Sequence, residues 1–197
     1  MFTRIFPALT PATRALILIN VGVFLLQQLF GPSFDQLFAL WPLGSGLFHP
    51  WQVLTYAFLH GGISHIVVNM FALFMFGSAL ESFWGPRRFI IYYLVCSLAA
   101  GLTQLAVAAP EATVGASGGI FGVLLAFAWY FPHQRVLLIF PPIPMPAWLF
   151  VTLYALLELY FGVSGRDQSV AHFAHLGGLV GGALCILYWR ARGRFRH

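Results

Sequence analysis

The chain has 197 residues, of which 60% are hydrophobic and only 8% are charged, and its mean hydropathy is +0.85. A soluble domain carries about 25% charged residues, so this composition excludes a soluble fold and indicates an integral membrane protein. The formal net charge is +5 and all ten basic residues are arginines. They lie at the ends of apolar segments instead of forming one aromatic-studded patch. This pattern argues against a nucleic-acid partner and for topology signals at a lipid bilayer.

Apolar segments of nearly spanning length recur along the whole chain. A membrane-spanning helix needs about 20 mainly apolar residues. We therefore predict an all-α polytopic membrane protein, a bundle of six transmembrane helices that forms a single domain over residues 1–197. The helices are expected at about residues 14–30, 61–80, 89–108, 117–131, 147–161 and 170–188.

The arginines predict the orientation of this bundle. Nine of the ten fall on one side of the six predicted helices, and only Arg166 falls on the other. Cytoplasmic loops are rich in basic residues, so both termini are expected in the cytoplasm. Because the N-terminus lacks the pattern of a cleavable signal or transit peptide, we expect a prokaryotic plasma membrane. The nine cytoplasmic arginines would be Arg4, Arg14, Arg87, Arg88, Arg135, Arg190, Arg192, Arg194 and Arg196.

Two connecting segments have an unusual composition. Residues 31–57, between the first two helices, contain no Lys or Arg and are rich in tryptophan and proline. We expect them to form a loop half-submerged in the membrane interface. The link between the fourth and fifth helices carries prolines at positions 141, 142, 144 and 146. Proline disrupts the interior of a helix, so this link is predicted to be a stiff connector.

Polar residues gather at one end of three alternate helices. In the predicted topology the second, fourth and sixth helices all run from the outside to the inside, so their N-terminal portions meet at the outer face. These portions carry His65, Asn69, Ser117, His172 and His175. A polar side chain in hydrocarbon costs several kcal/mol unless it has a partner, and it faces the bundle interior or a water cavity. We therefore expect these side chains to converge below the outer surface.

The convergence suggests serine hydrolase chemistry without a cofactor. A serine hydroxyl is a weak nucleophile until a base takes its proton, and imidazole does this near neutral pH. We predict Ser117 as the nucleophile and His175 as the base. No Asp or Glu lies near the outer ends of those three helices, so we expect a dyad without a triad acid. Asn69, His65 and the backbone N–H groups that begin the fourth helix could stabilise an oxyanion.

Glycines flank the serine and follow the histidine. Gly115 and Gly118 would let a substrate backbone approach closely. Gly178 and Gly182 are expected to be packing positions that draw the sixth helix against the fourth. A serine among glycines could itself be a packing residue, and a membrane histidine could be a structural hydrogen-bonding group. The sequence leaves these structural alternatives open beside the catalytic ones.

The remaining polar residues have less specific interpretations. His60 and His172 are expected to be structural or to provide water access to the site. Glu158 is expected to face inward or to reach the interface, because facing lipid would be costly. The H-E-x-x-H motif is absent, and no pair of helices carries the repeated facing histidines of a dihaem protein. We therefore predict no metal.

Three spaced motifs, in order, resemble the rhomboid intramembrane serine proteases. His65-Ile-Val-Val-Asn69 resembles the family's H-x-x-x-N, and Gly115-Ala-Ser117-Gly118 resembles its G-x-S-G. The stretch from Ala174 through His175 and Gly178 to Gly182 resembles its A-H-x-x-G-x-x-x-G. Each motif is weak alone, but the three in order on the second, fourth and sixth helices are a strong signal. The resemblance covers nearly the whole chain. The resemblance implies that Ser117 is the nucleophile, that His175 is the general base, and that His65 and Asn69 assist the oxyanion.

The resemblance also implies a substrate and marks two departures. The expected reaction is hydrolysis of a peptide bond in a transmembrane segment of a protein substrate, by a minimal six-helix form whose site opens to the extracytoplasmic side. Many members have a tyrosine that stacks on the catalytic histidine at the position of Phe121. A phenylalanine there can still stack on the histidine, but it has no hydroxyl for a hydrogen bond. The family's Trp-Arg pair, in which the arginine would brace the first loop, reads Trp51-Gln52 here.

The sequence also bears on how a substrate would enter and on functions other than proteolysis. A substrate helix would have to enter laterally and unwind locally, and the short fifth helix is our candidate gate against the second. The alternative from another class is a non-catalytic rhomboid-like protein that binds transmembrane clients. Loss of Ser117 or His175 would favour that alternative, and both are present. A transporter would show midplane charges and paired broken helices, which the sequence lacks.

Overall fold

The computed structural model describes residues 8–107, 111–137, 143–166 and 170–193. Helices dominate it and occupy all six predicted segments. In chain order the elements are α1 (Pro11–Phe30), α2 (Pro32–Phe38), α3 (Gln52–Thr55), η1 (Tyr56–Phe58), α4 (Ile63–Ala72), η2 (Leu73–Gly77), α5 (Ser78–Trp84), α6 (Pro86–Ala106), α7 (Ser117–Tyr130), β1 (Arg135–Leu137), β2 (Pro144–Pro146), α8 (Ala147–Ser164) and α9 (His172–Ala191).

Five helical segments are long and apolar enough to cross a membrane, which confirms the predicted class of polytopic membrane protein. They are Pro11–Phe30, Ile63–Trp84, Pro86–Ala106, Ala147–Ser164 and His172–Ala191. The second of these joins α4 to α5 through η2, a single π-helical turn. The sixth apolar helix, α7, has only 14 residues. At about 1.5 Å per residue it is about 21 Å long, against a hydrocarbon core of about 30 Å.

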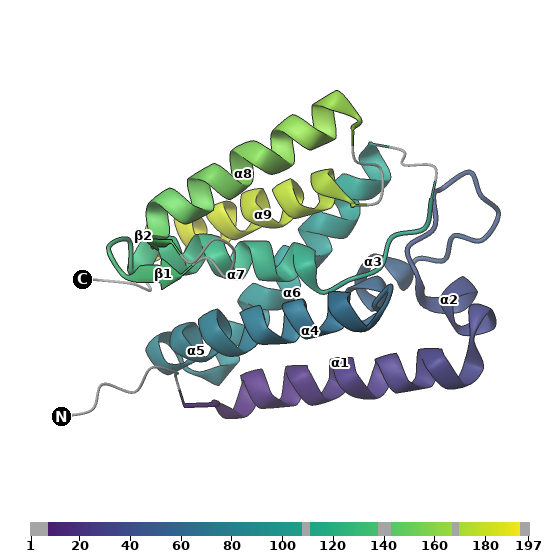
Figure 1. The fold of residues 1–197 in the computed structure, drawn as a ribbon, viewed down its shortest axis with the longest axis horizontal. Coiled ribbons are helices and arrows are strands. Elements are labelled where there is room, and N and C mark those ends of the chain that lie inside the picture. Colours follow the sequence, from purple (N-terminus) through teal and green to yellow (C-terminus); the bar gives the residue numbers. More distant parts are fainter. Residues whose placement is uncertain (1–7, 108–110, 138–142, 167–169, 194–197) are drawn as a thin grey trace.

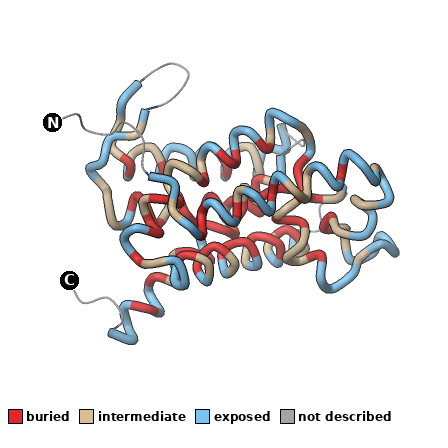
Figure 2. Tube along the Cα trace, turned by 90° about the horizontal axis from the view of Figure 1, so that it is seen from below, coloured by how far each residue is buried: buried red, intermediate tan, exposed pale blue. Residues whose placement is uncertain are grey.

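The bundle places α7 and α9 near its centre. In Figure 1, α1 lies along one edge and α8 along the opposite edge, with α4 and α5 next to α1 and with α7 and α9 between them and α8. The start of α1, the end of α9 and the β1–β2 hairpin lie at the same end of the bundle. The buried residues follow the central helices (Figure 2), and α9 is buried along much of its length whereas α8 has few buried residues.

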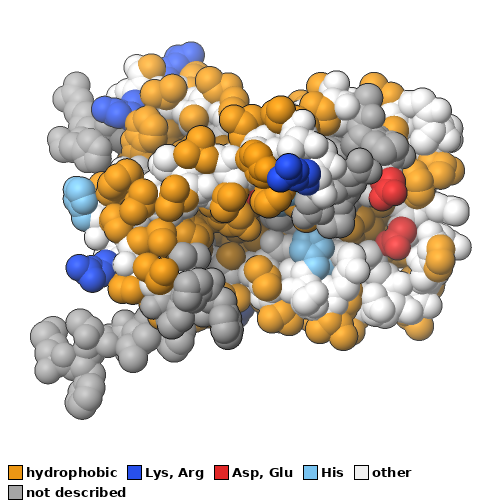
Figure 3. Space-filling view, turned by 45° about the horizontal axis from the view of Figure 1, so that its top comes forward, with side chains coloured by type: hydrophobic (Ala, Val, Ile, Leu, Met, Phe, Trp, Pro, Cys, Tyr) orange, Lys and Arg blue, Asp and Glu red, His pale blue; other side chains and the backbone are white. Residues whose placement is uncertain are grey.

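Apolar side chains cover the outside of the bundle. Figure 3 shows hydrophobic side chains across much of one face, with arginines mainly at one end and acidic side chains toward the other. Leu29, Ile63 and Val163 are among the most exposed, each with more than 70% of its surface accessible. Exposed apolar surface of this extent requires an apolar environment, which the lipid bilayer provides.

Glycines allow the central helices to touch through their backbones. A Cβ atom on Gly178 of α9 would clash with the carbonyl oxygen of Gly118 on α7. A Cβ on Gly182 would instead clash with the hydroxyl of Tyr92 on α6. Gly178 therefore sets the distance between α9 and α7, whereas Gly182 sets the distance between α9 and α6.

A buried carboxylate caps the first helix. Glu81 of α5 accepts hydrogen bonds from the backbone N–H groups of Ala12 and Thr13 at 2.8 and 2.7 Å. It also accepts hydrogen bonds from the hydroxyls of Thr10 and Thr13 at 2.5 and 2.9 Å. The first N–H groups of a helix have no acceptor within the helix and carry partial positive charge. Glu81 thus satisfies them and fastens α1 to α5.

Replacing Glu81 by glutamine is expected to reduce the free energy of unfolding by about 2–4 kcal/mol, because the neutral amide removes a charged acceptor from a buried site. Thermal or denaturant unfolding of the protein in detergent micelles measures the change. Glu111→Gln is the matched control, since Glu111 is exposed and its replacement should leave stability unchanged. Equal stability of the Glu81 variant and the control would contradict this role.

Two connections contain more structure than the sequence predicted. The link between α7 and α8 contains an antiparallel pair in which Arg135, Val136 and Leu137 face Pro146, Met145 and Pro144. Over the described residues the protein is all-α apart from this short pair, which the sequence did not predict. Proline has no N–H to donate but tolerates an extended edge strand, so the prolines end a helix without excluding a strand. Pro141 and Pro142 lie outside the described residues.

The first loop is folded around Gln52. Its side-chain oxygen accepts hydrogen bonds from the backbone N–H groups of Trp41 and His49 at 3.3 and 3.1 Å. Its amide nitrogen donates to the carbonyl oxygens of Gln36, Leu37 and Leu47 at 3.0–3.3 Å. Gln52 is fully buried. The loop, which contains α2, α3 and η1, therefore has a polar brace although the position holds no arginine.

Candidate functional site

Ser117 is the first residue of α7 and is held there by the loop before it. Thr113 forms a two-hydrogen-bond bridge with Leu40 of the first loop, at 2.9 and 3.0 Å. The N–H of Gly115 donates to the carbonyl oxygen of Tyr56 at 3.0 Å. Gly115 has a φ of 135°, a conformation that residues with a side chain rarely adopt. These contacts fix the turn that presents the Ser117 hydroxyl.

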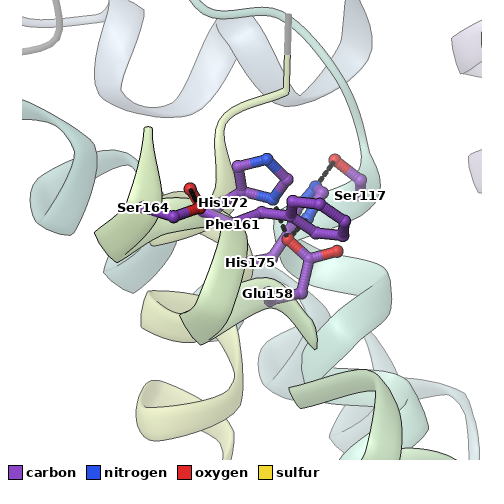
Figure 4. Close-up of polar contacts among 6 residues, drawn as sticks. All are labelled: Ser117, Glu158, Phe161, Ser164, His172 and His175. Carbon is purple, nitrogen blue, oxygen red and sulfur yellow. Dashed lines mark hydrogen bonds and ion pairs between the residues drawn. The ribbon is translucent and has the colours of Figure 1, made fainter. Parts of the chain in front are cut away.

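His175 of α9 reaches Ser117 directly. Its Nε2 atom lies 2.7 Å from Ser117 Oγ, and the two residues are 58 positions apart in sequence. The close approach of α7 and α9 at Gly118 and Gly178 makes this distance possible. Figure 4 shows the hydroxyl and the imidazole pointing toward each other from the two helices. His175 is buried, whereas Ser117 is half-buried.

Phe121 lies flat against the His175 ring. The two ring centroids are 4.3 Å apart and the planes differ by 9°. Tyr154 of α8 contacts the Phe121 ring at a centroid distance of 4.7 Å. Phe121 follows Ser117 by one helical turn on α7, which places it on the same side of that helix. The imidazole is therefore held in one plane by an aromatic ring that comes from the helix of the serine.

A carboxylate that the three-helix pattern did not predict lies beside His175. The acid comes from the fifth membrane helix, not from the second, fourth or sixth. Glu158 of α8 is buried, with Oε2 at 2.9 Å from His175 Nδ1. The same oxygen lies 2.6 Å from His172 Nδ1. Figure 4 shows Glu158 reaching from α8 toward both histidines. The expectation of a site without a nearby acid is therefore wrong.

The two contacts of Glu158 differ in geometry. The contact with His172 meets hydrogen-bond criteria. The contact with His175 has the distance of an ion pair, but the Nδ1–H direction is not aligned with the oxygen. Catalytic hydrogen bonds are often poorly aligned without substrate and tighten in the complex. The sequence predicts a structural or water-access role for His172, and its contact with Glu158 places it beside His175.

The site also contains three residues of the types that bind metal ions, namely Glu158, His172 and His175. Among the described residues, their ligand atoms lie within 4.8 Å of one another. Zinc bonds of about 2.0–2.1 Å in tetrahedral geometry would separate two ligand atoms by about 3.3 Å. The separations of 2.6 and 2.9 Å between the carboxylate oxygen and the two ring nitrogens are shorter. This arrangement is that of a carboxylate hydrogen-bonded to His172 and close to His175.

His65 lies on the other side of Ser117. The backbone N–H of Gly61 donates to His65 Nδ1 at 3.3 Å, so Nδ1 is unprotonated and the ring proton is on Nε2. A Cβ on Gly115 would lie 2.9 Å from His65 Nε2 and 3.4 Å from Ser117 Oγ. The missing side chain of Gly115 therefore leaves a small space between an N–H donor and the serine oxygen.

Asn69 and His60 bring further polar groups to this side. Asn69, one turn beyond His65 on α4, is buried, and its Nδ2 atom has no hydrogen-bond partner among the described residues. The ring of His60 contacts the ring of His65 edge to face at 5.1 Å. Burial, and next the neighbouring His65, lower the pKa of His60 to about 4, so this imidazole is neutral near pH 7. Its two ring nitrogens make no hydrogen bond of full geometry to the described residues, although the nearby backbone of Phe58 partly offsets the lowering of the pKa.

Comparison with known proteins agrees with this architecture. A family model described as the rhomboid domain matches residues 47–192. Rhomboid protein 1, mitochondrial, of Saccharomyces cerevisiae is 34% identical over 141 residues, which are 68% of this chain and 40% of that protein. Rhomboid protease GluP of Bacillus subtilis is 33% identical over 132 residues, which are 67% of this chain and 24% of that protein.

A third relative matches nearly the whole chain. Rhomboid protease GlpG of Klebsiella pneumoniae is 26% identical over 196 residues, which are 94% of this chain and 66% of that protein. The chain thus spans from about a quarter to less than two thirds of the length of these three relatives. The family match includes the segments that carry His65, Ser117 and His175. On this evidence the chain belongs to the rhomboid family.

Proposed function

We propose that this multi-pass membrane protein is a serine endopeptidase that hydrolyses peptide bonds in or near the transmembrane segments of other membrane proteins. The observation that carries the proposal is the 2.7 Å separation between Ser117 Oγ and His175 Nε2. A base must lie within about 2.6–3.2 Å of the proton donor that it activates. The names of two relatives, the rhomboid proteases of Bacillus subtilis and Klebsiella pneumoniae, support the reaction class.

In the first half of the reaction Ser117 is the nucleophile. Its oxygen forms a bond to the substrate carbonyl carbon while the hydroxyl proton moves to His175 Nε2. The electron pair of the carbonyl double bond moves to the carbonyl oxygen, which becomes an oxyanion. When the oxyanion collapses, the peptide C–N bond breaks and the imidazolium gives its proton to the leaving amine. An acyl-enzyme on Ser117 results.

The oxyanion would occupy the space that Gly115 leaves open. Three kinds of donor would serve it: the N–H groups of the first turn of α7, His65 Nε2–H, which borders this space, and the Asn69 amide. The unpartnered state of Asn69 Nδ2 supports this role, because a buried donor without an acceptor costs about 1–3 kcal/mol. Preorganised donors of this kind typically lower the activation barrier by about 2.7–4 kcal/mol each.

In the second half of the reaction water hydrolyses the acyl-enzyme. His175, neutral again, takes a proton from the water while the water oxygen attacks the acyl carbon. The ester bond between the acyl carbon and Ser117 Oγ then breaks, and the imidazolium returns its proton to Oγ, which releases the acid product and restores the free serine. Water must therefore reach a site inside the bundle. The buried ring nitrogens of His60 could hold such water next to His65. No cofactor or metal takes part in any of these steps.

The proposed orientation follows from charge and helix length. The described arginines at the start of α1, at the start of α6, on β1 and at the end of α9 would face the cytoplasm, and Arg166 would face the opposite side. If α7 reaches the cytoplasmic surface, its length of about 21 Å leaves Ser117 several ångströms below the other surface. The site would open to the extracytoplasmic side of a plasma membrane, within one domain of six membrane helices.

Cleavage of a model substrate by wild type and by Ser117→Ala tests this proposal. The protein is reconstituted in liposomes with a fluorogenic transmembrane peptide, and wild type is expected to cleave it at least about 10³-fold faster than Ser117→Ala. Ser82→Ala is the matched control, because Ser82 lies on α5, outside the site, and donates to the Ser78 carbonyl. Equal cleavage by wild type and Ser117→Ala would overturn the proposal. Substrate binding without cleavage would favour the non-catalytic, client-binding alternative.

A further inference from the structure

Glu158 is the one buried residue in the second half of α8, where Phe161 also stacks on His172 at a centroid distance of 5.6 Å. Only Ala147, Val151 and Glu158 are buried among the 18 residues of this helix. Ala147 and Val151 belong to its first half. In its second half Leu156, Leu157, Leu159 and Val163 are exposed, with accessible fractions of 47–73%. The carboxylate is thus the buried polar contact of a half-helix that also packs on α9 through Phe161 and exposes most of its other side chains.

An ionisable residue inside a membrane protein is costly unless it has a partner or a function. The Glu158 carboxylate has two imidazole partners, His175 at 2.9 Å and His172 at 2.6 Å, and both contacts involve Nδ1 atoms. His172 lies one turn before His175 on α9, so the two rings approach the same oxygen from one helix. A fixed donor on His172 holds the carboxylate beside His175.

The position of this carboxylate affects which nitrogen of His175 carries the proton. An acceptor at Nδ1 favours the tautomer with the proton on Nδ1, which leaves the lone pair on Nε2 to accept the proton of Ser117. In soluble serine proteases, replacing the corresponding acid by its amide leaves the geometry intact but selects the wrong tautomer, at a cost of about 10⁴-fold in kcat. Phe121 fixes the plane of the same ring but cannot select a tautomer.

We propose that Glu158 is a positioning residue for the catalytic base, so that the site works as a Ser117–His175–Glu158 triad in which α8 supplies the acid. The carboxylate stays ionised throughout: the proton of Ser117 moves to Nε2, and the imidazolium is stabilised by the charge at Nδ1. Because Glu158 anchors the outer half of α8, outward movement of that half withdraws the acid from His175. The inference rests on the proteolytic function proposed above.

Kinetics of Glu158 variants in liposomes test the positioning role. Glu158→Gln is expected to lower kcat by about 10²-fold or more while KM changes little, because the amide can present a donor to Nδ1. Glu158→Asp keeps the charge and is expected to recover part of kcat. Val151→Ala is the matched control, since it removes another buried contact of α8 without touching His175, and its kcat should stay within about twofold of wild type.

Nitrogen-15 NMR of the histidines in detergent gives a readout that does not depend on cleavage. The His175 signal is identified by its loss in His175→Asn. Wild type is expected to carry the proton on Nδ1, and Glu158→Gln is expected to shift it toward Nε2. An unchanged tautomer in Glu158→Gln would overturn the inference, whether or not the wild type is proteolytic. So would a kcat of Glu158→Gln within twofold of an active wild type, or an equal loss of kcat in Val151→Ala.

Discussion

Replacing His175 by asparagine is expected to lower cleavage of a transmembrane substrate by about 10⁴–10⁶-fold, the range found when a residue of a serine-protease triad is removed. The asparagine side chain offers no nitrogen that can take a proton from Ser117 near neutral pH. It also lacks the flat ring that packs on Phe121. Initial rates of the purified variant in liposomes, at saturating substrate, measure the loss in kcat.

The control for this variant uses another histidine of the same chain. His133 lies in the exposed turn after α7, so His133→Asn removes an imidazole without altering the site and should keep the wild-type rate. Thermal unfolding in the same detergent must show that His175→Asn is folded. A folded His175→Asn that retains more than a tenth of the wild-type kcat would show that another group activates the serine.

Gly178→Ala is expected to lower both the stability of the fold and the rate of substrate cleavage, because it disturbs the packing of α9 on α7. The added methyl group would overlap the carbonyl oxygen of Gly118, and neither backbone can yield without separating α9 from α7. Overpacking in a core typically costs about 1–3 kcal/mol, and a backbone clash lies at the upper end of this range. A displacement of about 1 Å between Ser117 and His175 can cost about 10²-fold in rate. We expect both losses together, in thermal unfolding and in substrate cleavage.

Gly22→Ala provides the comparison for Gly178→Ala. Gly22 lies within α1, and a Cβ atom there would have no neighbour within 4 Å. Alanine favours a helix over glycine by about 0.8–1.0 kcal/mol, so this variant should be as stable as wild type or slightly more so. If Gly178→Ala matches Gly22→Ala in both stability and rate, the close contact of α7 and α9 does not position the site.

The helices could be predicted from the sequence because hydrocarbon demands long apolar runs. The predicted segment 61–80 corresponds to α4, η2 and α5, which together span Ile63–Trp84. The predicted segment 147–161 corresponds to α8, which continues to Ser164. The C-terminal boundaries lie three to four residues later than predicted, because polar or small residues such as Ser164 extend a helix without adding to its apolar signal. At the other end, α4 begins two residues later than predicted, after Gly62.

The short elements could not be predicted in the same way. The β1–β2 pair forms between extended residues of a proline-rich link, where local composition indicated only the absence of a helix. The brace at Gln52 depends on five backbone groups that the folded loop brings together. A glutamine amide has both donors and an acceptor, so it can bind carbonyl and N–H groups of the loop at once.

The site residues that could be predicted from the sequence are those on helices that begin at the same membrane face. Ser117, His65 and His175 share this property, and the arginine pattern was sufficient to bring them together. Glu158 is on α8, which runs in the opposite direction, so the outer end of that helix is its C-terminal end. A search limited to helices that begin at the outer face therefore does not include Glu158. Glu158 was expected to face inward or to reach the interface, and it is buried. A second histidine one turn before His175 was the available sign of a shared acid.

Covalent labelling with a fluorophosphonate is the most direct test of the central claim that His175 activates Ser117. The probe reacts with a serine only when its oxygen is nucleophilic, and mass spectrometry of the labelled full chain identifies the residue. We predict one label on Ser117 in wild type and in His133→Asn, and none in Ser117→Ala or in folded His175→Asn. Labelling of Ser117 at the wild-type rate in His175→Asn, or no labelling of wild type at Ser117, would contradict the account.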